Sequence, residues 1–167
     1  MTANVHEPNF DAGEERPGFE FRRARLGRQA GAERLGASLY EVPPGKACFP
    51  YHSHTANEEM LIVLRGRPSL RTPDGWRELA EGEVVSFPAG PRGAHQVQNR
   101  TDEDVRFLMI SEMRAPEVNL YPDSGKIGAM ERAPGSPPAA DAFVGFFRRD
   151  AATDYWEGEP EPEGSDG

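Results

Sequence analysis

Residues 45–66 read GKACFPYHSHTANEEMLIVLRG, and two features of this stretch decide the fold prediction. Residues 59–64 form a dense apolar run that ends at Gly66, which is typical of a buried strand followed by a turn. Before this run, His52 and His54 are separated by a single residue. Residues two apart in a strand project from the same face, so both imidazoles can reach one site.

The flanking sequence predicts further short strands separated by turns. The predicted strands cover residues 19–26, 35–42, 69–72, 76–79, 84–87, 94–98 and 105–111. Pro43-Pro44-Gly45 cannot continue a sheet, and Pro73-Asp74-Gly75 is a strong hairpin-turn signal. Because turns recur every eight to twelve residues or so, and no convincing helix interrupts them, we predict an all-β sandwich or barrel.

A third histidine, His95, lies in the sequence GAHQVQN. Imidazole binds Zn, Fe, Ni and Cu well, and Mn when a carboxylate joins. His95 and a nearby glutamate would complete a set of three nitrogen ligands and one oxygen ligand. Glu58 and Glu59 both qualify as that glutamate, because they project from opposite faces of the predicted strand and the pattern does not choose between them.

Two segments resemble the motifs of the cupin family. Residues 45–66 are similar to the first motif, G-x5-H-x-H-x3,4-E-x6-G, with one extra residue before His52. Residues 82–99, GEVVSFPAGPRGAHQVQN, are similar to the second motif, G-x5-P-x-G-x2-H-x3-N, with two extra residues before His95. Both insertions lie in predicted turns.

The resemblance implies a double-stranded β-helix, or jelly-roll barrel, as a single cupin domain. It also implies one divalent transition metal ion (Zn, Fe, Mn or Ni) near one mouth of the barrel. The ligands that it implies are His52, His54, Glu59 and His95, and it selects Glu59 by its spacing to Gly66. The phrases YPDSGKIG and DYWEGE resemble a group of uncharacterised bacterial and archaeal single-domain cupins.

The composition divides the chain into a body and extended ends. We expect a flexible arm over residues 1–18, the barrel over 19–113, a covering or linking segment over 114–156 and a disordered tail over 157–167. The last eighteen residues hold seven acidic side chains and no Lys or Arg. Residues 1–149 are almost neutral, with 21 acidic side chains against 19 basic ones, so the charge of −9 lies mainly in the tail.

Several partners and sites are not expected. No basic stripe favours nucleic acid, no apolar stretch has the length of a membrane span, and the N-terminus lacks a signal-peptide layout, so we expect a cytoplasmic protein. The single cysteine, Cys48, excludes an internal disulfide and is a weak candidate as a sulfur ligand. Ser124-Gly125-Lys126 lacks the spacing of a P-loop, and for Arg106 a surface role is favoured over binding an anionic substrate.

Two functions are consistent with these residues. The first is a metal-dependent enzyme that acts on a small polar molecule, in the dioxygenase, decarboxylase or sugar isomerase class that the resemblance implies. The second is a non-catalytic module that binds a small ligand or acts as a sensor, because the sequence reveals no separate general base. We also expect a homodimer, in which residues 19–26 are a candidate for exchange between protomers.

Overall fold

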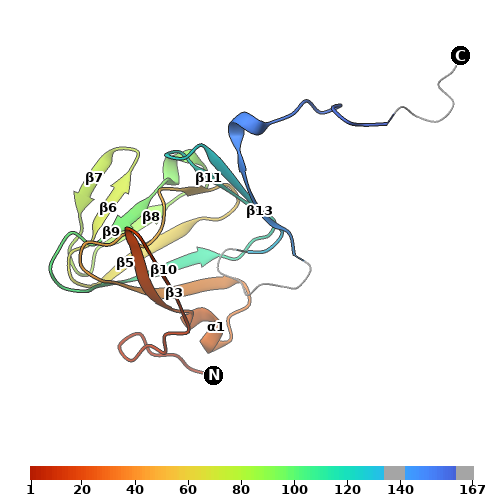
Figure 1. The fold of residues 1–167 in the computed structure, drawn as a ribbon. Coiled ribbons are helices and arrows are strands. Elements are labelled where there is room, and N and C mark those ends of the chain that lie inside the picture. Colours follow the sequence, from red (N-terminus) through yellow and green to blue (C-terminus); the bar gives the residue numbers. More distant parts are fainter. Residues whose placement is uncertain (134–141, 161–167) are drawn as a thin grey trace, which may run out of the picture.

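The computed structural model describes residues 1–133 and 142–160, and most of its regular structure consists of antiparallel strands (Figure 1). The largest sheet has six strands in the order β1-β2-β3-β10-β5-β8. Their bounds are β1 (Ala12–Arg16), β2 (Phe19–Ala24), β3 (Leu35–Val42), β10 (Val105–Glu112), β5 (Glu59–Arg65) and β8 (Val84–Phe87). Strands β3, β10 and β5 therefore form the centre of this sheet.

Two smaller sheets complete the body. One has the order β7-β6-β9, with β7 (Gly75–Glu78), β6 (Ser69–Thr72) and β9 (Gln96–Gln98). The other has the order β13-β12-β11-β4, with β13 (Val144–Arg148), β12 (Lys126–Met130), β11 (Glu117–Tyr121) and β4 (Ser53–His54). The predicted hairpin is confirmed, because Thr72 pairs with Gly75 across the Pro73-Asp74 turn.

The hydrophobic core lies between the six-stranded and three-stranded sheets. Alternate residues of the central strands point inward, as the strand period requires. The fully or largely buried members are Val42, Cys48, Leu61, Val63, Leu70, Leu79, Phe87, Val97, Val105, Phe107 and Met109. The all-β prediction is confirmed, and antiparallel sheets packed around one core are consistent with a jelly roll.

The N-terminal part contains a strand that the sequence analysis did not predict. Residues 12–16, placed there in a flexible arm, form β1 and pair along their whole length with β2. The strand was missed because four of its five residues are exposed at the sheet edge and no apolar alternation marks it.

The predicted strand over residues 19–26 ends earlier than expected. It stops at Ala24, and a short helix, α1 (Leu26–Ala30), follows on the outer face of the six-stranded sheet (Figure 1). Leu26 packs there against Ala24 and Leu39. A five-residue helix carries too few residues for a helical period to be read from sequence.

Beyond residue 113 the chain adds strands to the body. Strand β11 pairs with both β12 and β4, which is the strand that carries His54. Part of the predicted covering segment, residues 134–141, and most of the predicted tail, residues 161–167, lie outside the described residues. Two 3-10 turns, η1 (Pro91–Gly93) and η2 (Arg149–Ala151), complete the element list.

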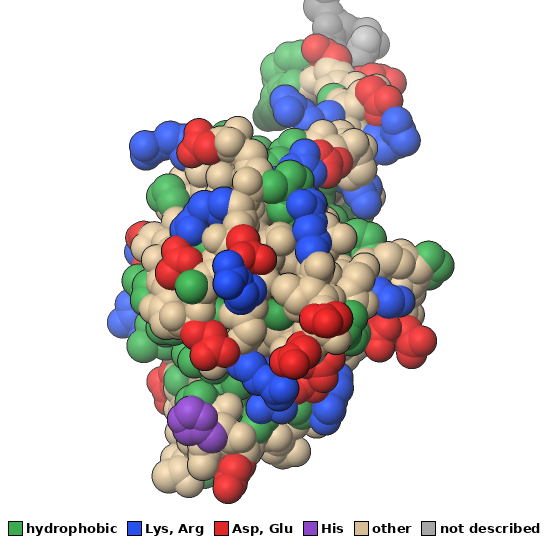
Figure 2. Space-filling view, turned by 90° about the vertical axis from the view of Figure 1, so that its left-hand side faces the viewer, with side chains coloured by type: hydrophobic (Ala, Val, Ile, Leu, Met, Phe, Trp, Pro, Cys, Tyr) green, Lys and Arg blue, Asp and Glu red, His purple; other side chains and the backbone are tan. Residues whose placement is uncertain are grey.

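The surface of the described residues has mixed charge and no long apolar helix. Figure 2 shows acidic and basic side chains interspersed on one face of the molecule. In the described part of the chain, no helix has the length and apolar character needed to cross a membrane.

Candidate metal centre

His52 and His95 lie opposite each other in an antiparallel bridge that joins the two sequence motifs. The amide of His52 donates to the carbonyl of His95 at 3.1 Å, and the amide of His95 donates to the carbonyl of His52 at 2.8 Å. This double hydrogen bond fixes the separation of the two backbones. Residues 43 apart in sequence therefore present their imidazoles to the same space, with ring centroids 4.8 Å apart.

Glu59 starts β5 and points inward, whereas Glu58 is exposed. Glu59 lies on the same face as the core residues Leu61 and Val63, and only 8% of it is exposed. Its strand is fixed in register by pairing with Ser111 of β10. Of the two glutamates that the sequence left open, only Glu59 reaches the histidines.

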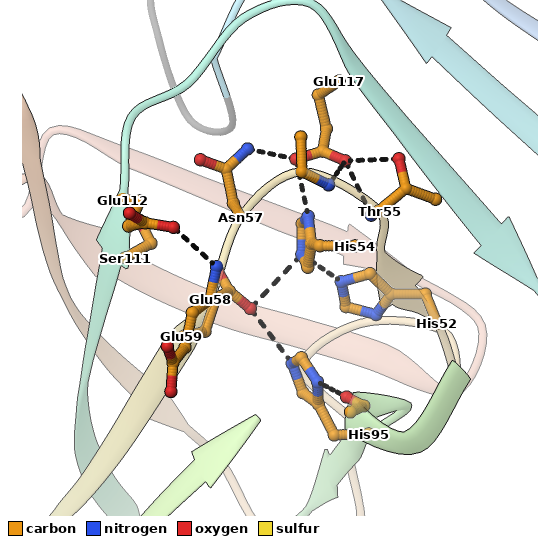
Figure 3. Close-up of polar contacts among 12 residues, drawn as sticks. His52, His54, Thr55, Asn57, Glu58, Glu59, His95, Ser111, Glu112 and Glu117 are labelled. Carbon is orange, nitrogen blue, oxygen red and sulfur yellow. Dashed lines mark hydrogen bonds and ion pairs between the residues drawn. The ribbon is translucent and has the colours of Figure 1, made fainter. Parts of the chain in front are cut away.

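The histidine Nε2 atoms and one carboxylate oxygen converge (Figure 3). Oε2 of Glu59 lies 3.2 Å from Nε2 of His54 and 3.3 Å from Nε2 of His95. Nε2 of His54 lies 3.2 Å from Nε2 of His52. Ligands of one ion at a bond length of ~2.1 Å are separated by roughly 3.0–3.4 Å when adjacent, so these distances fit a shared metal. The ligand atoms of His52, His54 and Glu59 all lie within 4.8 Å of one another, and this group could bind a metal ion.

Backbone carbonyls orient two of the imidazoles. Nδ1 of His52 lies 2.9 Å from the carbonyl oxygen of Pro50, and Nδ1 of His95 lies 3.0 Å from that of Gly93. A carbonyl oxygen only accepts, so each Nδ1 must carry the proton. Each Nε2 is then left with a lone pair, and that of His95 is buried without a hydrogen-bond partner. Among the described residues, this unsatisfied nitrogen of His95 fits a metal at this position.

Glu117 on β11 was not found by the sequence analysis, although it contacts the site. It is completely buried, and its Oε2 lies 3.6 Å from Nδ1 of His54. The side chain of Asn57 donates to the same oxygen, and the amides of Thr55 and Ala56 donate to Oε1 at 2.9 and 3.3 Å. No motif marks residue 117. It reaches the site because its strand, β11, pairs with β4, the strand that carries His54.

Burial and neighbouring charges give the titrating groups different pKa values. Burial, reinforced by the other histidines, lowers the pKa of His52 to about 3. Burial alone would also lower that of His54, but the carboxylates of Glu117 and Glu59 raise the pKa of His54 to about 9. For Glu59, burial opposes ionisation, yet His54 and His95 hold the pKa of its carboxyl well below the usual range. Without a metal, therefore, an ion pair between Glu59 and a protonated His54 occupies the centre of the site.

Aromatic rings pack against two of the imidazoles. The ring of Phe87 stacks on that of His95 with centroids 4.0 Å apart, and Tyr121 stacks on His52 at 5.9 Å. A cavity of about 240 Å³ opens beside the cluster. Its lining consists of Phe21, Arg23, Tyr40, Phe49, His52, His54, Glu59, His95 and Met109.

Other residues considered in the sequence have structural positions. Cys48 belongs to the hydrophobic core and not to the His-His-Glu group, and burial raises the pKa of its thiol. Arg106 pairs with Glu41 at 2.6 Å, in agreement with the role favoured from sequence. The side chain of Asn99 donates to the carbonyls of Val42 and Glu103 at 2.9 and 2.7 Å, so it stabilises a turn.

The comparisons with known proteins agree with this architecture. Residues 38–111 match the family model of the cupin domain. The crystal structure of a candidate sugar phosphate isomerase from Acidithiobacillus ferrooxidans has a TM-score of 0.70 and 26% identity, over 83% of this chain and 82% of that chain. A search of curated proteins finds no match.

Two further solved structures are similar. The crystal structure of a sugar phosphate isomerase from Silicibacter pomeroyi, described as a member of a cupin superfamily, has a TM-score of 0.76 and 24% identity, over 91% of this chain and 95% of that chain. A polyketide cyclase from Streptomyces resistomycificus has a TM-score of 0.51 and 26% identity, over 70% and 77%. Residues 38–111 therefore form a cupin domain, and the chain shares its fold with these solved structures.

Proposed function

We propose that this chain binds one divalent transition metal ion through His52, His54, Glu59 and His95, and that it acts as an enzyme on a small polar molecule in the adjacent cavity. The observation that carries the proposal is the approach of Nε2 of His54 and Nε2 of His95 to one carboxylate oxygen of Glu59, with Nε2 of His52 at 3.2 Å from that of His54. The carbonyls behind His52 and His95 leave those nitrogens free to bind a metal.

Three nitrogen ligands and one oxygen ligand suit Zn, Fe, Mn or Ni. A bound ion of this kind supplies Lewis-acid polarisation of a substrate oxygen, or activation of dioxygen, depending on the metal. The protein residues hold the ligand set in place and exclude bulk water through the packed rings of Phe87 and Tyr121. An ion that takes more than four ligands keeps a coordination position for water or substrate beside the four protein ligands.

The cavity favours an enzyme over a purely structural metal site. A structural site needs no space beside the ion, whereas this cluster opens onto about 240 Å³. Two polar side chains, Arg23 and Tyr40, line that space together with the histidines. Convergent polar groups in a small, partly apolar cavity are typical of a substrate site.

Among the reaction classes that the cupin family offers, we favour sugar isomerisation. The support is the similarity to the Acidithiobacillus ferrooxidans protein, a candidate sugar phosphate isomerase that is 26% identical over 83% of this chain. A metal beside a small cavity that holds a few polar side chains suits a reaction in which a carbonyl oxygen is polarised. Aldose–ketose interconversion of phosphorylated sugars, measured with each of the four metals in turn, tests this class.

The metal proposal is tested by comparing two adjacent glutamates. Glu59→Gln removes the charged oxygen at the centre of the cluster, while Glu58→Gln changes an exposed side chain next to it. Calorimetric titration of chelator-treated protein with Zn²⁺ and Mn²⁺ should give one site per chain for the native protein and for Glu58→Gln. Glu59→Gln should bind at least tenfold more weakly. Equal affinities of the two variants would contradict the proposed ligand set.

We also propose that the protein forms a homodimer. The support is the edge strand β13, whose side chains Val144, Phe146 and Phe147 are 39–55% exposed. An apolar edge strand has unpaired backbone groups and invites pairing with a second copy of the same strand.

A further inference from the structure

Arg23 reaches the metal cavity from a strand that carries no cupin motif residue. It lies on β2, where Phe21 and Arg23 share one face and Arg22 shares the other with Ala24. Arg23 pairs in register with Tyr40 of β3, and side chains opposite each other in an antiparallel pair lie on the same side of the sheet. Both residues line the cavity beside the cluster.

The guanidinium of Arg23 is poorly satisfied within the protein. Among the described residues its Nε is buried without a hydrogen-bond partner, and the guanidinium donates a single hydrogen bond, from Nη1 to the hydroxyl of Tyr40 at 3.5 Å. Its neighbours differ, since Arg22 pairs with Glu41 at 3.1 Å and Arg25 with Asp11 at 3.2 Å. Within residues 1–133 and 142–160, no carboxylate forms an ion pair with Arg23.

The charge balance of the cavity favours an anion. Glu59 is the one carboxylate among the lining residues, and it is engaged by His54 and His95. A divalent metal on the four ligands would bring two positive charges, and Arg23 brings a third within the same small space. The carboxylates of Glu59 and of the deeper Glu117 offset two of these three positive charges, so one positive charge remains in excess. A buried excess charge is costly unless a ligand of opposite sign neutralises it.

We propose that Arg23 and Tyr40 form an oxyanion subsite, which binds a carboxylate or phosphate group of the small molecule held next to the metal. Arg presents paired N–H donors that match the oxygens of either group. Burial raises the pKa of Tyr40 to about 12, so its hydroxyl keeps a proton to donate. This inference rests on the proposed function for the metal, but its test separates the two.

The test compares Arg23→Gln and Arg23→Lys with Arg22→Gln, which alters the adjacent arginine on the other face of β2. Each metal-loaded protein is titrated calorimetrically with inorganic phosphate and, separately, with acetate. We expect Arg22→Gln to bind as the native protein does, Arg23→Gln to lose at least tenfold in affinity, and Arg23→Lys to fall between them, because a point charge replaces a fork of donors. The anion whose binding is weakened more by Arg23→Gln identifies the group that the subsite prefers.

A second readout reports on Arg23 directly. The NMR signal of its Nε–Hε group should shift on addition of the anion, while that of Arg22 should not. Metal titrations of the three variants should match the native protein. If the native chain binds no metal, the proposed function fails, and the same anion titrations on metal-free protein still test Arg23. Unchanged anion affinity in Arg23→Gln, or no anion binding by native protein at millimolar concentration, would overturn the subsite.

Discussion

His54 lies between two carboxylates, with Nε2 at 3.2 Å from Oε2 of Glu59 and Nδ1 at 3.6 Å from Oε2 of Glu117. Glu117 thus stands behind the imidazole, on the side away from the other ligand atoms (Figure 3). A carboxylate in this position orients the ring and raises the basicity of the nitrogen that binds the metal. His52 and His95 have a backbone carbonyl in the equivalent place.

Glu117→Gln should therefore weaken metal binding by about 10–100-fold. The amide keeps an oxygen for the Thr55 and Ala56 amides, but it removes the charge behind His54 and faces the Asn57 amide with a second donor. We expect a stability loss of about 1–3 kcal/mol from that unsatisfied contact. Metal titration and urea unfolding measure the two effects separately.

The control for this prediction is Glu112→Gln, since the side chain of Glu112, on β10, accepts hydrogen bonds from Arg114 and from the Glu58 amide and none from a proposed ligand residue in the described part of the chain. It should leave metal affinity unchanged. A Glu117→Gln protein with native affinity would show that the carboxylate does not support His54.

The stability of the metal-free protein should be greatest near pH 6.5. Because the folded-state pKa of His54 is raised to about 9, above its ordinary 6.5, its contribution is complete below pH 6.5 and is lost as pH rises through 9. The pKa of His52 is lowered to about 3, so its contribution is complete above pH 6.5 and is lost as pH falls towards 3. Urea unfolding of chelator-treated protein between pH 4 and pH 9 measures both losses.

In His54→Gln the loss of stability between pH 6.5 and pH 9 should disappear, while the loss on the acid side should remain. An unchanged alkaline loss in this variant would mean that another group is responsible for it.

Phe107→Ala should lower the free energy of unfolding by about 3–5 kcal/mol. Phe107, on β10, is completely buried, and its ring stacks on that of Tyr40 with centroids 5.3 Å apart. Phe147→Ala, at a position 52% exposed, should cost about 0.5 kcal/mol or less in a monomer. Similar losses for the two variants would contradict the position of the core between the sheets.

The homodimer is expected to depend on β13. Sedimentation velocity should show a dimer at micromolar concentration, and Phe147→Lys should shift the protein towards the monomer, because a charge would face the partner strand. A native protein that is monomeric under these conditions would count against the dimer.

Much of the fold could be predicted because the strand signals are local. Residues 35–42, 69–72 and 84–87 were predicted with the bounds that the structure gives to β3, β6 and β8. Each is a short apolar or alternating run that ends at a Pro or Gly turn. The exposed strand β1 and the one-turn helix α1 carry no such signal, and their conformation depends on pairing and packing with β2 and β3.

The site divides in the same way. His52, His54, Glu59 and His95 stand in recognisable spacings, and the structure brings them together. Arg23 and Glu117 lie on strands β2 and β11, and only the order of strands in the sheets brings those strands to the site. The spacing of residues in a single sequence does not show which distant strands pair. For this reason the sequence analysis considered Arg106 as an anion-binding residue and did not consider Arg23.

The most direct test of the central claim is anomalous diffraction from crystals of protein purified without chelating resin, recorded above and below the absorption edge of the bound metal. We predict one anomalous peak per chain, within bonding distance of Nε2 of His52, His54 and His95 and of the Glu59 carboxylate. A peak elsewhere, or crystals soaked in Zn²⁺ or Mn²⁺ that show none at this position, would contradict the account.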